Sequence, residues 1–253
     1  MKLSDGPDVH VYDDRNRASD AMAIDVVGKL LLTPPGQTIL LATGVTMLDF
    51  YPKFIARARE RDLNLSAFLY GHLDNYVWRP SEYPVGPGKE DFVVYLKENF
   101  LIPAHIPSDH FFPINGATED PDAIAFDYEM WLKKQTVAAA FLGMGPVPEV
   151  HLAYMQAATP LDSGVHYSTL SSATIKRNVS RGETVPTEVL TVGLADLRRA
   201  THKFVLAFGK TEEVRKALTG PITTDVVATA LRTDGFKESV HVYLDETSAQ
   251  GLY

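Results

Sequence analysis

The feature that most constrains this chain is a continuous apolar run over residues 137–142. It shows no alternation of apolar and polar side chains, which is typical of a strand buried on both faces of a parallel sheet. The run breaks at residues 143–145 into a proline-rich loop that carries an acid, Glu149, and a base, His151. Because open α/β sheets place their ligands beyond the carboxyl ends of their strands, this pair is a candidate catalytic site. A tight turn followed by a hydrogen-bonded structural histidine is the alternative interpretation.

Composition excludes several classes of protein and site. The chain has 253 residues, 45% of them hydrophobic, so it is long enough to bury a sizeable core. It contains no cysteine, which excludes disulfides, thiol nucleophiles and thiolate metal sites. The formal net charge is −8 and no basic cluster is present, so we expect no nucleic-acid partner. The polar first ten residues and the lack of an apolar run of about 20 residues predict a cytoplasmic protein without a membrane segment.

Predicted strands and helices alternate along the whole chain without a break in composition. This pattern favours a single α/β domain over residues 1–253, with a mostly parallel sheet and helices on both faces. The longest predicted helices after the first third of the chain cover residues 90–99, 120–134 and 211–219. We expect strands over residues 9–12, 38–42, 65–73, 111–114, 137–142, 168–172, 188–194, 203–208 and 241–244.

Polar residues follow two other predicted strands. The loop over residues 42–46 joins a strand to a helix, an arrangement that can direct backbone N–H groups at a phosphate, although a plain connection is the alternative. Asp74 ends the next strand, where it can serve as a general base or as the N-cap of the following helix. A polar segment over residues 176–183 carries three cations and is either a solvated loop or an anion clamp.

These features fall in an order that resembles a known superfamily, that of glucosamine-6-phosphate deaminase (isomerising) and 6-phosphogluconolactonase, and the deaminase branch more closely. The family motifs TGGTP, MDEYVGL, GVGxDGHIAFNEP and LTVG are similar to four segments of this chain. The segments follow one another in family order between about residues 38 and 210, so the resemblance covers most of the chain. These segments are ATGVT at 42–46, LDNYV at 73–77, GMG at 143–145 with EVHLAY at 149–154, and LTVG at 190–193.

The resemblance implies a modified Rossmann-like fold and an enzyme of amino-sugar metabolism. The implied reaction is aldose–ketose isomerisation of a hexose 6-phosphate with loss of ammonia, a hydrolase activity that needs no metal or organic cofactor. It assigns Asp74 as the base that carries a proton between C2 and C1. His151 would open the pyranose ring, and Glu149 would orient the imidazole.

The resemblance also implies a phosphate and substrate site. Thr43, Gly44 and Thr46 would bind the phosphate through N–H and hydroxyl groups, and Arg181 would add a bidentate cation. Gly143, from the glycine motif, belongs to the same implied binding set.

Several positions depart from the family pattern. Val45 replaces a loop glycine, Gln156 replaces a glutamate of the binding set, and Glu149 replaces a shorter aspartate. Glu212 stands in register with the family's phosphate lysine, so Lys210, two residues earlier, is the candidate substitute. These departures leave open two alternatives, a 6-phosphogluconolactonase-like hydrolase and a non-catalytic sensor of sugar phosphates.

The remaining histidines show no metal-ligand spacing along the chain, so we expect no metal site. His72 is the one expected nearest to the active site. A homo-oligomer, the identity of the sugar and its stereochemistry are left open by the sequence.

Overall fold

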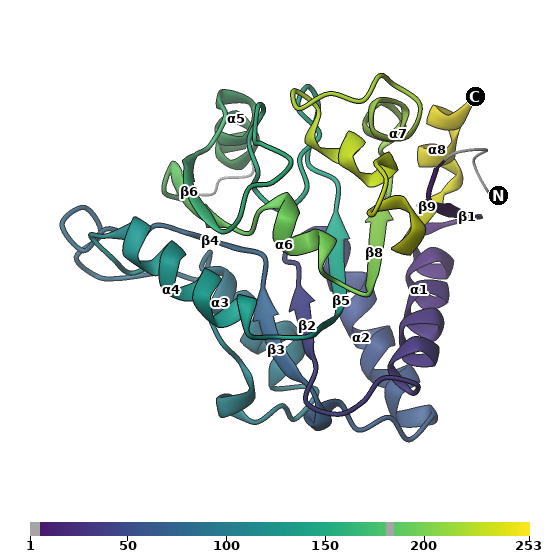
Figure 1. Cartoon of the computed structure of the whole chain (residues 1–253), viewed down its shortest axis with the longest axis horizontal. Coiled ribbons are helices and arrows are strands. Elements are labelled where there is room, and N and C mark those ends of the chain that lie inside the picture. Colours follow the sequence, from purple (N-terminus) through teal and green to yellow (C-terminus); the bar gives the residue numbers. More distant parts are fainter. Residues whose placement is uncertain (1–5, 181–184) are drawn as a thin grey trace.

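A computed structural model of the chain describes residues 6–180 and 185–253. Its centre is a six-stranded sheet in the order β1-β9-β8-β5-β2-β3, in which every neighbouring pair is parallel. The predicted α/β class with a mostly parallel sheet is confirmed (Figure 1). The strands of this sheet are β1 Asp8–Tyr12, β2 Thr38–Leu41, β3 Leu69–His72, β5 Val137–Gly143, β8 His202–Ala207 and β9 Val240–Asp245.

Helices cover both faces of this sheet. The chain first moves from β1 towards β3 and then returns towards β9, and parallel crossovers are right-handed. This reversal places α1 and α2, which pack against each other, on one face and α4, α6 and α7 on the other. The helices are α1 Arg15–Leu30, α2 Val45–Glu60, α3 Phe92–Leu96, α4 Pro121–Lys133, α5 Ser172–Ser180, α6 Leu194–Arg198, α7 Thr211–Leu218 and α8 Glu246–Ala249.

Local sequence explains where the main elements begin and why they are buried. The side chain of Asp14 caps α1 by accepting a hydrogen bond from the Arg17 N–H at 2.8 Å, as expected for an N-cap residue. All four residues of β2 are buried, and so are all residues of β5 except the last. Burial on both faces of the sheet explains why the sequences of these strands are almost entirely apolar.

A second, smaller sheet was not expected. It has three antiparallel strands in the order β4-β7-β6, with bounds Asp74–Tyr76, Glu188–Thr191 and His166–Thr169. β3 ends at His72 and β4 begins at Asp74, so the chain passes from one sheet to the other within a single residue. This second sheet has its own cluster of buried hydrophobic side chains, formed by Tyr76, Trp78, Leu170 and Val189.

Other expectations need correction. Residues 111–114 do not form a strand, because only Phe111 makes a bridge, to Tyr70, and Pro107 and Pro113 cannot donate to a ladder. Residues 65–73 divide into a 3₁₀ turn at Leu65–Ala67, β3 and the junction. The polar segment at 176–183 begins inside α5 rather than in a loop. Residues Val227–Arg232 form a 3₁₀ helix.

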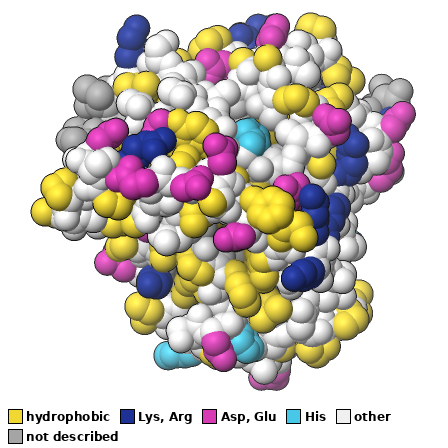
Figure 2. Space-filling view, turned by 60° about the vertical axis from the view of Figure 1, so that its left-hand side comes forward, with side chains coloured by type: hydrophobic (Ala, Val, Ile, Leu, Met, Phe, Trp, Pro, Cys, Tyr) yellow, Lys and Arg dark blue, Asp and Glu magenta, His cyan; other side chains and the backbone are white. Residues whose placement is uncertain are grey.

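The remaining turns are short. A π-helical turn over Lys97–Leu101 continues α3, and further 3₁₀ turns occupy Ser108–His110, Lys237–Ser239 and Gln250–Leu252. Among the described residues, none of the helices combines the length and apolar character that a membrane span requires. On the face shown in Figure 2, basic and acidic side chains are interspersed with hydrophobic ones.

Candidate active site

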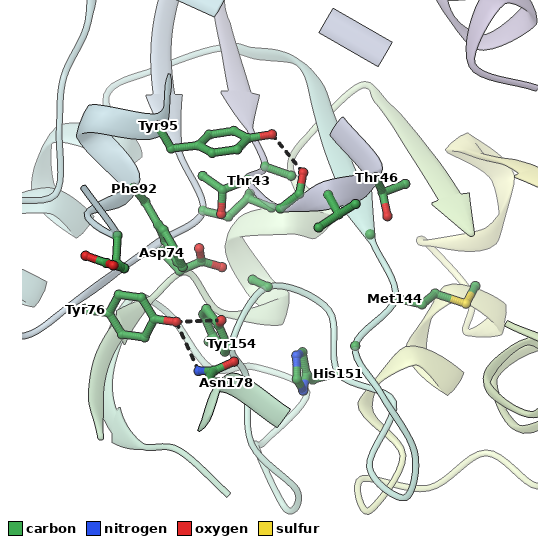
Figure 3. A pocket seen from close by; sticks show the side chains of 18 of the residues that line it. Thr43, Thr46, Asp74, Tyr76, Phe92, Tyr95, Met144, His151, Tyr154 and Asn178 are labelled. Atoms are coloured by element: carbon green, nitrogen blue, oxygen red, sulfur yellow. Dashed lines mark hydrogen bonds between the residues drawn. The ribbon is translucent and has the colours of Figure 1, made fainter. Parts of the chain in front are cut away.

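A cavity of about 510 Å³ lies at the carboxyl ends of four parallel strands. Residues 42–46 enter it after β2, Asp74 after β3, Gly143 at the end of β5 and Lys210 after β8. This is the edge where open α/β sheets hold their ligands. Aromatic residues of the smaller sheet and of α3 form the facing wall (Figure 3).

Asp74 is a buried carboxylic acid within this cavity. Its side chain points into the cavity in Figure 3, although the residue is only 5% exposed. Burial disfavours the charged form and raises the pKa of Asp74 from 3.8 to about 7. Near neutral pH the carboxyl group therefore exists in both protonation states, which suits a group that accepts and returns a proton.

His151 lies in the same cavity, on the loop that follows β5. The Gly145 N–H donates a hydrogen bond to the carbonyl oxygen of His151 at 2.8 Å, which folds the loop back on the strand end. Val150 and Ala153 flank this position with φ values of +42° and +50°, a region that side chains other than glycine rarely adopt. Such strain persists only where surrounding packing holds it, and it is typical of functional sites.

The loop between β2 and α2 forms the end of the cavity suited to an anion. Gly44 adopts φ +99° as the N-cap of α2, a conformation that favours glycine, and its carbonyl oxygen accepts a hydrogen bond from the Tyr95 hydroxyl at 2.8 Å. Thr43 and Thr46 also line the cavity here. The first turn of a 16-residue helix carries positive partial charge, so N–H groups and hydroxyls converge where an anion is favoured. Val45, which departs from the family glycine, is 52% exposed.

Lys210 supplies a cation to this cavity. It immediately precedes α7 and lines the cavity, with its Nζ 3.8 Å from Oε1 of Glu213. Glu212, the residue in register with the family lysine, does not line the cavity and pairs with Arg215 instead, at 2.8 Å from Nε. The structure therefore places Lys210, and not Glu212, in the lining of the cavity.

Other predicted residues lie elsewhere. Glu149 is half-buried outside the cavity lining, so its expected action on His151 stays a prediction. Gln156 also lies outside the lining; it donates to the Tyr154 carbonyl oxygen at 2.6 Å and accepts from the Ser171 N–H at 2.8 Å. Arg181 lies outside the described residues.

His72, expected nearest to the site, is a core residue. Its Nε2 accepts a hydrogen bond from the Ile114 N–H at 2.7 Å, and the residue is fully buried outside the cavity lining. Burial lowers the pKa of His72 to about 3, so this imidazole stays neutral and structural.

Sequence reasoning missed the aromatic wall. The Tyr76 hydroxyl lies 3.2 Å from the Tyr154 hydroxyl and accepts a hydrogen bond from Asn178 Nδ2 at 3.2 Å (Figure 3). Phe92 stacks on Tyr154 with ring centroids 5.7 Å apart. These residues come from β4, α3, α5 and the loop after β5, and no spacing in the sequence relates them.

Asn75 was also missed as a positioning residue. This fully buried side chain uses its whole hydrogen-bonding capacity. Its Nδ2 donates to Asp91 Oδ2 at 3.1 Å and to the Ile114 carbonyl oxygen at 3.0 Å, and its Oδ1 accepts from the N–H groups of Tyr76 and Phe92. The only sequence signal is a polar residue directly after Asp74 in a buried segment.

Comparisons with known proteins show the family of this chain. No family model matches the chain. A curated glucosamine-6-phosphate deaminase of Streptococcus gordonii is 29% identical over 206 residues, covering 79% of this chain and 82% of the relative. Another, from Enterococcus faecalis, is 30% identical over 221 residues, covering 84% of this chain and 86% of the relative. The chain belongs to the glucosamine-6-phosphate deaminase family.

Solved structures of other proteins share the fold of this chain. A monomeric glucosamine-6-phosphate deaminase superposes with a TM-score of 0.84 at 24% identity, covering 96% of this chain and 98% of the other. The 6-phosphogluconolactonase of Trypanosoma brucei superposes with a TM-score of 0.75 at 21% identity, covering 99% of this chain and 100% of the other. The modified Rossmann-like fold expected from the sequence is thereby confirmed.

Proposed function

We propose that this member of the deaminase family converts an amino-sugar 6-phosphate of the glucosamine type into a ketose 6-phosphate and ammonia. The observation that carries the proposal is Asp74, a buried carboxyl group whose pKa is raised to about 7. It shares one cavity with His151 and with the helix N-terminus that begins at Gly44. A proton carrier, an imidazole and an anion-binding loop are the groups that this reaction requires.

The proposed reaction proceeds through the open-chain sugar. His151 moves the proton that opens the pyranose ring. Asp74 then removes the proton from C2 and returns it to C1, which converts the aldose amine into a ketose imine. Water adds to the imine, and the carbon–nitrogen bond breaks to give the ketose and ammonia. In this scheme Glu149 orients His151, and no metal or organic cofactor takes part.

The phosphate of the substrate occupies the other end of the cavity. Thr43, Gly44 and Thr46 would bind it through N–H and hydroxyl groups, with Lys210 as the cation. Arg181 is proposed as a further cation, and Gly143 and Gln156 as further members of the binding set. We also propose that the chain acts as one cytoplasmic domain, as a monomer or homo-oligomer, with altered binding residues that adjust substrate choice.

The test is an assay of ammonia and ketose phosphate released from glucosamine 6-phosphate and, in parallel, from galactosamine 6-phosphate. We expect turnover by the wild type and its collapse in Asp74→Asn, with Asp234→Asn as the matched control, because the Asp234 side chain is 93% exposed. Loss of a proton carrier is expected to lower kcat by roughly 10²–10⁴-fold.

Two outcomes would favour other functions. Hydrolysis of 6-phosphogluconolactone without amino-sugar turnover would favour the lactonase, which uses His151 on water and has no need of the Asp74 shuttle. Thermal stabilisation by hexose 6-phosphates without any turnover would favour a sensor, because a ligand that binds only the native state raises its stability.

A further inference from the structure

Two histidines and an aspartate gather at the end of the main sheet opposite to the cavity. Asp8 and His10 lie two residues apart on β1, so their side chains share one face of the sheet. His241 lies near the start of β9 and is the direct register partner of Asp8 in the parallel pair. Asp8 and His241 lie at the amino-terminal ends of their strands and His10 at the middle of β1, whereas the cavity lies beyond the carboxyl ends.

The three side chains converge on one point. Each offers a ligand atom, and these atoms all lie within 4.8 Å of one another. Nε2 of His10 is 3.2 Å from Oδ2 of Asp8, and Nδ1 of His241 is 3.8 Å from the same oxygen. Tetrahedral zinc bound at about 2.0–2.2 Å from nitrogen and oxygen ligands separates those ligands by roughly 3.4 Å. Small side-chain rotations therefore suffice to close this set around an ion.

Both imidazole rings are held in place before any ion binds. The His10 ring stacks on Tyr243 with centroids 4.9 Å apart, and the His241 ring stacks on Phe204 at 5.4 Å. Solvent does not reach Nε2 of His10, and this atom makes no hydrogen bond within the part of the chain that the structure describes. A buried nitrogen that makes no hydrogen bond, yet lies 3.2 Å from a carboxylate oxygen, is available to bind an ion together with that oxygen.

We propose that Asp8, His10 and His241 bind one divalent transition-metal ion, with water in the fourth position and Zn²⁺ as the probe. Imidazole nitrogen with carboxylate oxygen is a ligand set that suits Zn²⁺, whereas the hard cation Mg²⁺ prefers oxygen alone. Lys29, at the end of α1, acts electrostatically on His241 and opposes a cation there, whereas Asp25 acts in the opposite sense. This site is independent of the proposed deaminase activity.

The bound ion would join β1 to β9. β1 is an edge strand of the main sheet, with β9 as its one neighbour in the sheet order. An ion bound by both strands stabilises their pairing and the native state, because binding to the native state alone raises the free energy of unfolding. The expected effect is on stability and metal content, not on chemistry in the distant cavity.

The experiment uses untagged, chelator-stripped full-length protein. Equilibrium dialysis is expected to give one Zn²⁺ per chain, and Zn²⁺ at a hundred times its Kd should raise Tm by about 5–10 °C, whereas Mg²⁺ should not. Asp8→Asn, which keeps the shape of the side chain, and His10→Gln should each weaken binding by about a hundred-fold or more. Lys29→Gln should tighten binding several-fold, and more at low salt.

His166→Gln is the matched control, because His166 lies on β6 in the other sheet, with Nδ1 2.8 Å from the Gly164 carbonyl oxygen. It should bind Zn²⁺ as the wild type does. Co²⁺ provides a readout on the wild type alone, since visible absorption bands of a four-coordinate ion are expected at one equivalent. The proposal is overturned if the wild type binds no stoichiometric Zn²⁺ or if Asp8→Asn and His10→Gln bind it equally well.

Discussion

A Cβ atom placed on Gly145 would lie 2.2 Å from Nε2 of His151. Real side chains essentially never approach so closely, so the imidazole occupies the volume that any larger residue at position 145 would need. The glycine after Met144 thus serves the placement of the histidine, because its own N–H also holds the His151 carbonyl oxygen. The GMG motif and the histidine form one structural unit.

Gly145→Ala is therefore expected to displace the imidazole of His151 and to lower kcat by about a hundred-fold, since a misplacement of 1 Å in an active site can have that effect. Steady-state kinetics of ammonia release would measure it. Gly28→Ala is the control, because a Cβ there meets nothing within 4 Å. Equal activity of both variants would contradict the assigned position of His151.

Asp74 predicts the pH dependence of activity. Its carboxylate form is the base, and burial raises its pKa to about 7 in the free enzyme. The profile of kcat/KM should therefore fall as the pH decreases through about 7, since this profile reports free-enzyme groups. If kcat/KM fell only near pH 4, or only near the pKa of about 6 of the substrate phosphate, the role of Asp74 would be contradicted.

Asp74 also predicts how stability depends on pH. Because the native pKa of about 7 exceeds the ordinary value of 3.8, the native state binds more protons between these values, and stability falls as the pH rises through this window. Above pH 7 the raised pKa of Asp74 lowers the free energy of unfolding by about 4 kcal/mol. Asp74→Asn should therefore melt higher than the wild type at pH 8 and similarly at pH 4. A constant difference in Tm across this range would contradict the raised pKa.

Asn75→Ala is expected to destabilise the protein by about 2–4 kcal/mol, because buried partners on Asp91, Ile114 and Phe92 lose their hydrogen bonds. Urea denaturation would measure the change. Asn99→Ala is the matched control, since Asn99 is half-buried and donates to Tyr95. Asn99→Ala should lower the free energy of unfolding by only about 1 kcal/mol. Similar costs for both variants would contradict a positioning role for Asn75.

Lys210→Gln is expected to raise KM for the phosphorylated sugar about tenfold or more, with a smaller change in kcat, if this cation binds phosphate in the ground and transition states alike. Lys216→Gln is the control, because Lys216 lies on α7 with its Nζ 3.3 Å from the Pro148 carbonyl oxygen. An unchanged KM in Lys210→Gln would assign the phosphate to other groups.

The part of the site that lies on strand ends was predictable from the sequence. Thr43 and Gly143 follow or end solid apolar runs, Asp74 follows a third predicted strand, and parallel strands bring their carboxyl ends to one edge. The fold class followed from the same runs. The sequence did not determine which side chains at this edge point into the cavity. Glu149 lies two residues before His151 in the same loop, yet it is outside the cavity lining.

The rest depended on contacts that local patterns do not encode. Asn178 and Tyr76 meet across 102 residues, and Tyr76 lies in a second sheet whose strands have three or four residues each. His10 and His241 come together only because the first and last strands are neighbours. Spacing along the sequence cannot detect either group, since both arise from the order of strands in space.

The two hydrophobic clusters allow the two walls of the cavity to evolve separately. His151, Lys210 and residues 43–46 follow strands of the main sheet, whereas Tyr76 belongs to the smaller cluster around Trp78 and Val189. Substitutions inside that smaller cluster can reshape the aromatic wall without repacking the six-stranded core. Relatives with the same proton-transfer groups can thereby acquire different sugar preferences through changes that leave the main sheet untouched.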